Sequence, residues 1–196
     1  MRTDCLIVGV GGQGTILASR IVGNAALSLG LDVRGSETIG MAQRGGSVAS
    51  HIRVGGASSP LISPGGADVI LAFELCEGAR ALPYLARDGV MIVCDRVIQP
   101  YSSAGTGGYD AAAVMEGVAS AVSRLCVLDG SYIIEHCRVK CLNMAVIGAA
   151  VALGALPCSM GDIERTIDAR FDSRRSDMNK NALRVGAELA KSYKKQ

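Results

Sequence analysis

Three short runs of aliphatic residues constrain the fold of this chain more than any other feature. They read CLIVGV, ADVILAFE and GVMIVCD, and their length is that of β-strands. Continuous apolar runs are typical of strands buried on both faces of a sheet. Segments with helical patterns separate these runs, which favours a wound sheet. We therefore expect one α/β domain over residues 1–196, a Rossmann-like three-layer sheet with a helical C-terminal part.

The remaining segments fit this arrangement. SVASHIRV alternates with period two and predicts a strand, RLCVLDG predicts a last strand, and LDVRGS is a poor strand candidate. Pro83 should kink a helix or start a new turn, and the spacing of Ser159 and Asp162 has the form of a capping box. QPYSSAGTGG predicts a loop over residues 99–108. Helices are predicted over residues 13–29, 77–87, 110–123, 132–137, 140–153, 160–171 and 177–191.

Composition narrows the classes of protein. Hydrophobic residues make up 49% of the chain but aromatic residues only 4%, so the apolar mass is small and aliphatic, and we expect part of the surface to be buried by another subunit. Twenty basic and 18 acidic residues leave a net charge of +2, and the dense basic run at residues 191–195 is a solvated terminus. No nucleic-acid partner is expected, because the dense basic run is confined to this terminus. No membrane partner is expected either, because residues 142–156 are too few to span a bilayer; they predict a buried or interface helix.

Seven cysteines are present without a CxxC pair. An odd number inside apolar runs indicates reduced thiols packed in the core of a cytoplasmic protein, and the early glycines exclude a signal peptide. The cysteine spacing excludes a ferredoxin-type cluster motif, and two isolated histidines give no zinc pattern. We therefore expect no metal site on this chain.

A glycine-rich turn follows the first strand. Gly9, Gly11 and Gly14 have G-x-G-x-x-G spacing between a strand and a helix, where backbone amides favour an anion such as a diphosphate. A dinucleotide site also needs an acidic residue after the second strand, and Glu37 is the nearest candidate. Three interpretations stay open: a dinucleotide site, a plain tight turn, and a contact with a phosphate or a partner. The P-loop sequence is absent.

These motifs together resemble a known family. GVGGQGT, ETIGMAQRGGSVASHIRVG and SPLISPGGADVILAFELCEGARALPYL are similar to the beta subunit of indolepyruvate:ferredoxin oxidoreductase, a relative of the gamma subunit of other 2-oxoacid:ferredoxin oxidoreductases. The likeness continues through Asn143 in LNMAVIGAA and through Asn179, Ala182 and Gly186, so it spans nearly the whole chain. The chain departs from the family in its cysteine-rich core and in Leu183, where an aromatic residue is frequent.

The resemblance implies a complex that oxidatively decarboxylates arylpyruvates with thiamine diphosphate and Mg²⁺, passes electrons through iron–sulfur clusters to ferredoxin, and forms an acyl-CoA. This chain lacks the G-D-G element of a thiamine diphosphate site, so a larger alpha subunit would carry these groups and this chain would be inactive alone. Two rival interpretations are a stand-alone nucleotide- or CoA-binding module and a purely structural subunit. The substrate, the stoichiometry and self-association of the isolated chain stay open.

The segment around Arg44 would then pack near the active site of another chain. Gly45 permits close backbone approach, and Met41 adds an apolar contact. The guanidinium of Arg44 can form two parallel hydrogen bonds with a carboxylate or phosphate, and Gln43 could orient Arg44. An ion pair between Arg44 and Glu37 is the structural alternative, and CoA is a candidate ligand. The predicted cofactor-binding residues are Gly9, Gly11, Gly12, Gln13, Gly14, Glu37, Met41, Gln43, Arg44 and Gly45, and no catalytic residue is assigned.

Three further features have two interpretations each. His51 is either a general base or part of a polar strand face at an interface. Cys137 and Cys141 would share one face if they were helical, as packing residues or as a redox pair. Tyr101 belongs either to a mobile edge over a ligand or to a surface turn.

Overall fold

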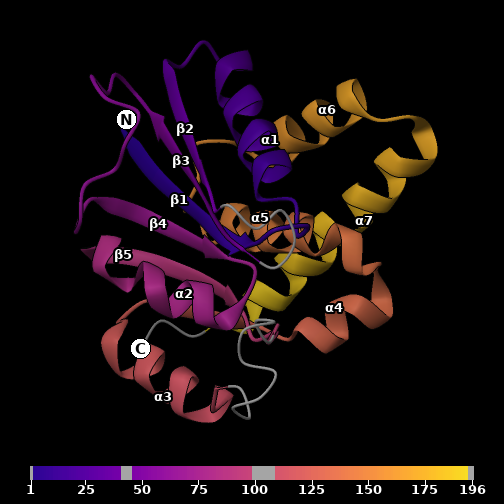
Figure 1. Ribbon diagram of the computed structural model, residues 1–196. Helices are drawn as coiled ribbons and strands as arrows, with labels where there is room; N and C mark the ends of the chain where they lie inside the picture. Colours follow the sequence, from indigo (N-terminus) through magenta and orange to yellow (C-terminus); the bar gives the residue numbers. More distant parts are fainter. Residues whose placement is uncertain (1, 41–45, 99–108, 194–196) are drawn as a thin grey trace.

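The computed structural model describes residues 2–40, 46–98 and 109–193 of the chain. Its described part contains a six-stranded sheet with the strand order β2-β3-β1-β4-β5-β6 (Figure 1). Strands β1, β4, β5 and β6 are parallel, whereas β3 runs antiparallel to both of its neighbours. The strands are β1 Thr3–Val10, β2 Val33–Ile39, β3 Ser47–Val54, β4 Ala67–Ala72, β5 Leu85–Cys94 and β6 Leu125–Leu128.

Helices cover both faces of this sheet. One face carries α1, α5, α6 and α7 over one apolar cluster, and the other carries α2 and α3 over a second cluster (Figure 1). The predicted three-layer α/β architecture is therefore confirmed. The helices are α1 Thr15–Ser28, α2 Leu75–Ala81, α3 Ala111–Ala121, α4 Gly130–His136, α5 Leu142–Ala152, α6 Met160–Arg170 and α7 Ser173–Lys191, with 3-10 turns η1 Leu82–Tyr84 and η3 Val139–Cys141. Within the described ranges, no helix is long and apolar enough to cross a bilayer.

Three sequence predictions need correction. Part of LDVRGS does form a strand, because β2 lies at the sheet edge beside β3 alone and needs no continuous apolar run. The helix predicted over residues 77–87 ends at Ala81, since Pro83 lies in η1 and the chain then enters β5. Helix α7 begins earlier than predicted, because Asp172 caps it by accepting the amide of Arg175. The Ser159–Asp162 capping box is confirmed.

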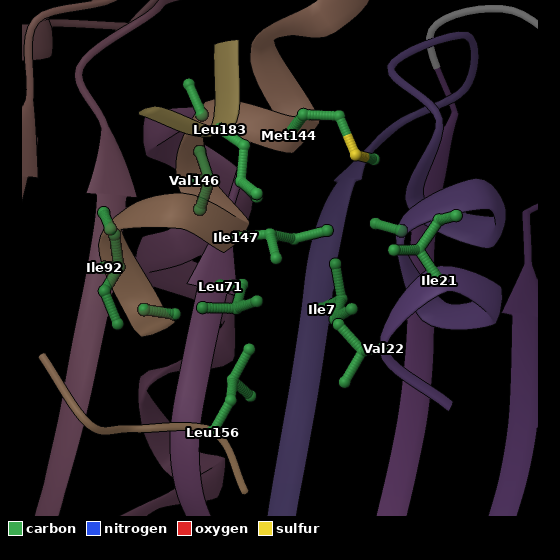
Figure 2. Packing of buried hydrophobic residues seen from close by; sticks show 14 of the residues in the cluster. Ile7, Ile21, Val22, Leu71, Ile92, Met144, Val146, Ile147, Leu156 and Leu183 are labelled. Carbon is green, nitrogen blue, oxygen red and sulfur yellow. The ribbon is translucent and has the colours of Figure 1, made fainter. Parts of the chain in front are cut away.

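Helix α5 is the centre of the larger core. Val146 and Ile147 project toward Leu71 and Ile92 of the central strands, while Leu183 approaches from α7 (Figure 2). Every residue from Leu142 to Ala150 is buried, and all of them except Asn143 are apolar or glycine, so α5 is a core helix covered on all sides. The sequence prediction of a buried helix is confirmed.

Two glycines let α5 and α7 touch backbone to backbone. A Cβ atom on Gly148 would lie 1.8 Å from the carbonyl oxygen of Leu183, and one on Gly186 would lie 1.8 Å from the carbonyl oxygen of Ala145. Gly148 ends the LNMAVIG element and Gly186 belongs to NKNALRVG, so helix packing explains why these positions are glycine.

The cysteines behave as predicted from their apolar surroundings. All seven are free, and Cys5, Cys94, Cys126, Cys141 and Cys158 are buried. Burial raises the pKa of Cys94, Cys126 and Cys158 to about 11, so these thiols stay protonated and pack as small hydrophobic groups.

Candidate functional site

The glycine turn at the end of β1 is held by its own glutamine. Oε1 of Gln13 accepts the Val10 amide at 2.8 Å, and Nε2 donates to the Phe73 carbonyl at 2.8 Å. This side chain ties the end of β1 to the end of β4. A Cβ atom on Gly9 would lie 2.7 Å from the same Oε1. Gly9 and Gln13 therefore shape the turn from inside.

Asn143 fills the space beside the last glycine of the turn. It is 1% exposed, and its Nδ2 donates to the Gly14 carbonyl at 3.2 Å while its Oδ1 accepts the Met144 amide at 2.9 Å. Gly14 has φ 81°, and a Cβ atom there would lie 2.5 Å from Nδ2 of Asn143. The close approach that Gly14 permits is thus made by a residue of the same chain.

The rest of the turn is more open. The Gly11 amide donates to the carbonyl of Gly46 at 2.8 Å, which brings the start of β3 to the turn. Gly12 is exposed with φ 101°, and no atom of the described residues lies within 4 Å of the position of a Cβ atom. Gly12, just ahead of helix α1, is therefore the position of this turn at which an external group finds free space.

Glu37 lies two strands away from the glycine turn. Strand β3 is inserted between β1 and β2, so at about 4.8 Å per strand the acid is displaced by roughly 10 Å from the line of β1. Its contact with α1 is the Ser19 hydroxyl, whose Oγ lies 3.4 Å from Oε1. Glu37 instead borders a groove of about 390 Å³ between α1 and β2. The strand insertion removes the geometry that a dinucleotide ribose needs.

Two buried glutamates follow β4, and the sequence interpretation missed both. Glu74 is 1% exposed and caps α2 by accepting the Glu77 amide at 2.8 Å. It also accepts the Ile98 amide at 3.2 Å and the Tyr109 hydroxyl. Burial and this hydrogen bond raise the pKa of Tyr109, which therefore stays protonated. The sequence signal that could have identified Glu74 and Glu77 is the presence of two carboxylates in FELCEG, directly after a buried strand.

Glu77 extends the network toward β3. Its Oε2 accepts the Ser47 hydroxyl at 2.5 Å, and its Oε1 accepts Nη1 of Arg80 at 2.5 Å. The carboxylate is buried, whereas the side chain of Arg80 is 60% exposed. Glu77 thereby holds Ser47, the first residue of β3, against α2, at the same end of the sheet as the glycine turn.

His51 and Arg53 are covered by their own chain. Nδ1 of His51 accepts the Ile62 amide at 3.2 Å, and burial lowers the pKa of the imidazole. Arg53 forms two hydrogen bonds of 2.9 Å with Asp4 and a third of 2.9 Å with the Leu61 carbonyl. Residues 59–62 of the same chain therefore lie over these side chains, and the two interpretations of His51, a general base and a polar strand face at an interface, stay predictions.

The other predicted site residues have mixed outcomes. Met41, Gln43, Arg44, Gly45 and Tyr101 lie outside the described residues, so their interpretations stay predictions, including the Arg44–Glu37 ion pair. Cys137 caps the end of α4 and Cys141 lies in η3, so the pair does not share a helix face. Among the described residues, no group of three or more His, Cys, Asp or Glu side chains could hold a metal ion.

Comparison with known proteins decides the family. Residues 4–189 match the family described as pyruvate ferredoxin/flavodoxin oxidoreductase. The chain is 37% identical to indolepyruvate oxidoreductase subunit IorB of Archaeoglobus fulgidus over 189 residues, 95% of this chain and 94% of that one. The IorB subunit of Methanothermobacter thermautotrophicus is 33% identical over 192 residues, 95% of this chain and 96% of that one. The chain belongs to the pyruvate ferredoxin/flavodoxin oxidoreductase family.

Solved structures agree with this assignment. The pyruvate oxidoreductase subunit PORC of Thermotoga maritima is 25% identical with a TM-score of 0.71, and the match covers 95% of this chain and 96% of that one. A 2-oxoglutarate:ferredoxin oxidoreductase from Magnetococcus marinus shares the fold at 18% identity with a TM-score of 0.73; the match covers all of this chain and 32% of that one. The family and fold predicted from the sequence are therefore confirmed, and this chain is part of an oxidoreductase of the ferredoxin-dependent kind.

Proposed function

We propose that this chain is the beta-type subunit of a complex that oxidatively decarboxylates arylpyruvates, indolepyruvate among them, to an acyl-CoA with ferredoxin as electron acceptor. The observation that carries the proposal is the 37% identity to an indolepyruvate oxidoreductase subunit over nearly the full length of both chains. The GMAQRGG sequence at residues 40–46, part of the resemblance to the indolepyruvate enzymes, supports the same substrate class.

We assign thiamine diphosphate, Mg²⁺ and the iron–sulfur clusters to a larger alpha subunit. The described part of this chain offers no group of three metal-ligating side chains, and its sequence lacks the G-D-G element. This chain's own residues would order the edge of the partner's site. Gln13, Asn143 and the Glu74–Glu77 pair fix the sheet end from which the segment with Arg44 departs.

CoA is the ligand that we propose to contact this chain. The Gly12 position, with open space around it ahead of the positive end of α1, fits a diphosphate. The Magnetococcus marinus protein that shares the fold is described with coenzyme A bound. Gly12 has φ 101°, so any side chain there strains the turn. A Gly12→Asp variant in addition places a carboxylate in this space, so relative to Gly12→Asn, which carries the same strain without the charge, we expect it to raise the KM for CoA in the assembled complex and leave the KM for indolepyruvate unchanged. Equal KM values for CoA would contradict this contact.

The experiment that tests the main proposal is purification of the chain from its native cells with its partners. Recovery of a thiamine- and iron–sulfur-containing subunit, with indolepyruvate-dependent reduction of a viologen dye, is the expected result.

We also place the complex in the cytoplasm, because all seven cysteines are free thiols.

A stand-alone nucleotide- or CoA-binding module is the second candidate. The open space at Gly12 favours it, since a ligand there would need no partner. Calorimetric titration of the isolated chain with NAD distinguishes the two, because CoA is expected to contact the chain in both: saturable dinucleotide binding without any partner favours the module, and absence of binding favours the subunit.

A further inference from the structure

Strand β2 leaves one edge of the sheet unpaired in the described part of the chain. It spans the seven residues Val33–Ile39, and the strand that it pairs with is β3 (Figure 1). Protein sheets commonly protect such an edge with a short strand, a lysine, a proline or a bulge. The other edge strand, β6, is short, at four residues, whereas β2 contains neither lysine nor proline and pairs with β3 without a register shift. The edge of β2 is therefore long and regular.

The hydrogen bonds at the two ends of β2 show which of its backbone groups face outward. The amide of Gly40 donates to the carbonyl of Ser47 at 3.0 Å, and the amide of Gly55 donates to the carbonyl of Asp32 at 2.9 Å. In an antiparallel ladder, residues that bond to the neighbouring strand alternate with residues that do not. Even-numbered residues of β2 therefore bond to β3, and the N–H and C=O groups of residues 33, 35, 37 and 39 point away from it. Within the described ranges, these outward groups have no hydrogen-bond partner.

Strand β2 is complementary to a second copy of itself. When a two-fold axis perpendicular to the sheet relates two antiparallel strands, residues on the same face lie opposite each other, so the register is symmetric about one residue. With the axis at Ser36, the midpoint of β2, the strands overlap over their full length. Val33 then meets Ile39 of the second copy, and Gly35 meets Glu37. These are the outward-facing residues, so every outward N–H and C=O group has a partner.

The side chains of β2 also suit this register. Arg34 would stand opposite Thr38 of the second copy. Glu37 would stand opposite Gly35, which has no side chain, so no like charges face each other directly. The Glu37 carboxylate would thereby extend over Gly35 toward the groove of about 390 Å³ that Arg20 lines. Arg20 is exposed and takes part in none of the ion pairs of the described residues, so it is a counter-charge for this glutamate.

We propose that two copies of this chain pair antiparallel along β2, so that their six-stranded sheets join into one continuous sheet about a two-fold axis at Ser36. The contact consists mainly of backbone hydrogen bonds along one strand, so we expect a weak dimer with a dissociation constant on the order of 10–100 µM. The inference concerns this chain by itself and does not rest on the proposed complex.

Single cysteines test the register. Ser36→Cys places two thiols across the axis, where the Cα atoms lie about 4.5 Å apart, within the range of a disulfide bond. Thr38→Cys, on the same face of β2, is the matched control, because its two copies lie about 14 Å apart along the paired strands. Diamide should therefore link the Ser36→Cys chain into a dimer and should link Thr38→Cys no more than the parent chain with its seven thiols. A mixture of Arg34→Cys and Thr38→Cys chains should link again, because these residues stand opposite each other.

Gly35→Pro tests the hydrogen bonds of the dimer. The N–H of Gly35 points away from β3, so proline preserves the ladder with β3 and removes one hydrogen bond from each copy. In sedimentation equilibrium of the full chain, this variant should associate at least about tenfold more weakly than the parent. The cysteine variants decide the question even if Gly35→Pro is unfolded.

Three results would each overturn the proposal. One is a parent chain that stays monomeric at a concentration on the order of 1 mM. Another is a folded Gly35→Pro chain that dimerises as tightly as the parent. The third is disulfide formation that is no better for Ser36→Cys than for Thr38→Cys, which would mean that the copies meet in another register or through another surface.

Discussion

A methyl group added at Gly148 tests the backbone contact between α5 and α7. The new Cβ atom would lie 1.8 Å from the Leu183 carbonyl oxygen, and real Cβ atoms essentially never lie closer than 3.0 Å to another atom, so the helices must separate by about 1.2 Å. Such overpacking costs about 3 kcal/mol. Alanine returns about 1 kcal/mol through its better helix propensity. A net loss of about 2 kcal/mol should lower the Tm of this 196-residue chain by about 4–8 °C.

Gly117 provides the matched control. It lies inside α3 and is exposed, and in the part of the chain that the structure describes no atom lies within 4 Å of the position of a Cβ atom. Gly117→Ala should therefore raise the Tm by about 2–4 °C, because only the propensity gain of about 1 kcal/mol remains. Thermal unfolding of both purified variants, followed by circular dichroism, gives the comparison. If Gly148→Ala melts at or above the temperature of the parent chain, the two helices are not in the contact described.

Three further predictions follow from the site. Gln13→Ala leaves the last amide of β1 unpaired and should destabilise the chain by about 1–3 kcal/mol in urea unfolding, whereas an unchanged midpoint would mean that the turn is held by other groups. Tyr109→Phe removes a hydrogen bond to the buried Glu74 carboxylate, so we expect a loss of about 1.5–3 kcal/mol in the same assay; a loss below about 0.5 kcal/mol would argue against that bond. Burial lowers the pKa of His51 below 6.5, so the unfolded chain binds this proton more readily and stability should fall as the pH drops below about 6.5. His51→Gln should lose less stability than the parent chain between about pH 7.5 and about pH 5.5, and equal losses would refute the assignment.

The sequence predicted the parts of the fold that burial determines. β1, β4 and β5 are continuous apolar runs because helices cover both of their faces, and β3 alternates because its two faces differ. Edge strand β2 was not predicted, since VRGSETI is polar and pairs on one side only. Strand order also could not be predicted, because no local pattern shows that β3 inserts between β1 and β2.

The candidate site was predicted only in part, for a related reason. G-x-G-x-x-G spacing identifies a tight strand-to-helix turn but not the side chains that fill it. Gln13 lies three residues from Val10, whose amide it accepts, but Asn143 lies 129 residues from Gly14, to whose carbonyl it donates. The buried glutamates after β4 read like ordinary helix-start residues. Their partners Ser47 and Tyr109 are brought near by the fold and not by sequence spacing.

The central claim is that this chain completes an arylpyruvate:ferredoxin oxidoreductase. Its most direct test is affinity purification of the chain from its native cells under anaerobic conditions, followed by CoA- and indolepyruvate-dependent reduction of a viologen dye. The account predicts a co-purifying subunit with thiamine diphosphate and iron–sulfur clusters, and dye reduction that requires both chains. A chain that elutes alone, or a complex that reduces the dye with other 2-oxoacids but not with an arylpyruvate, would contradict it.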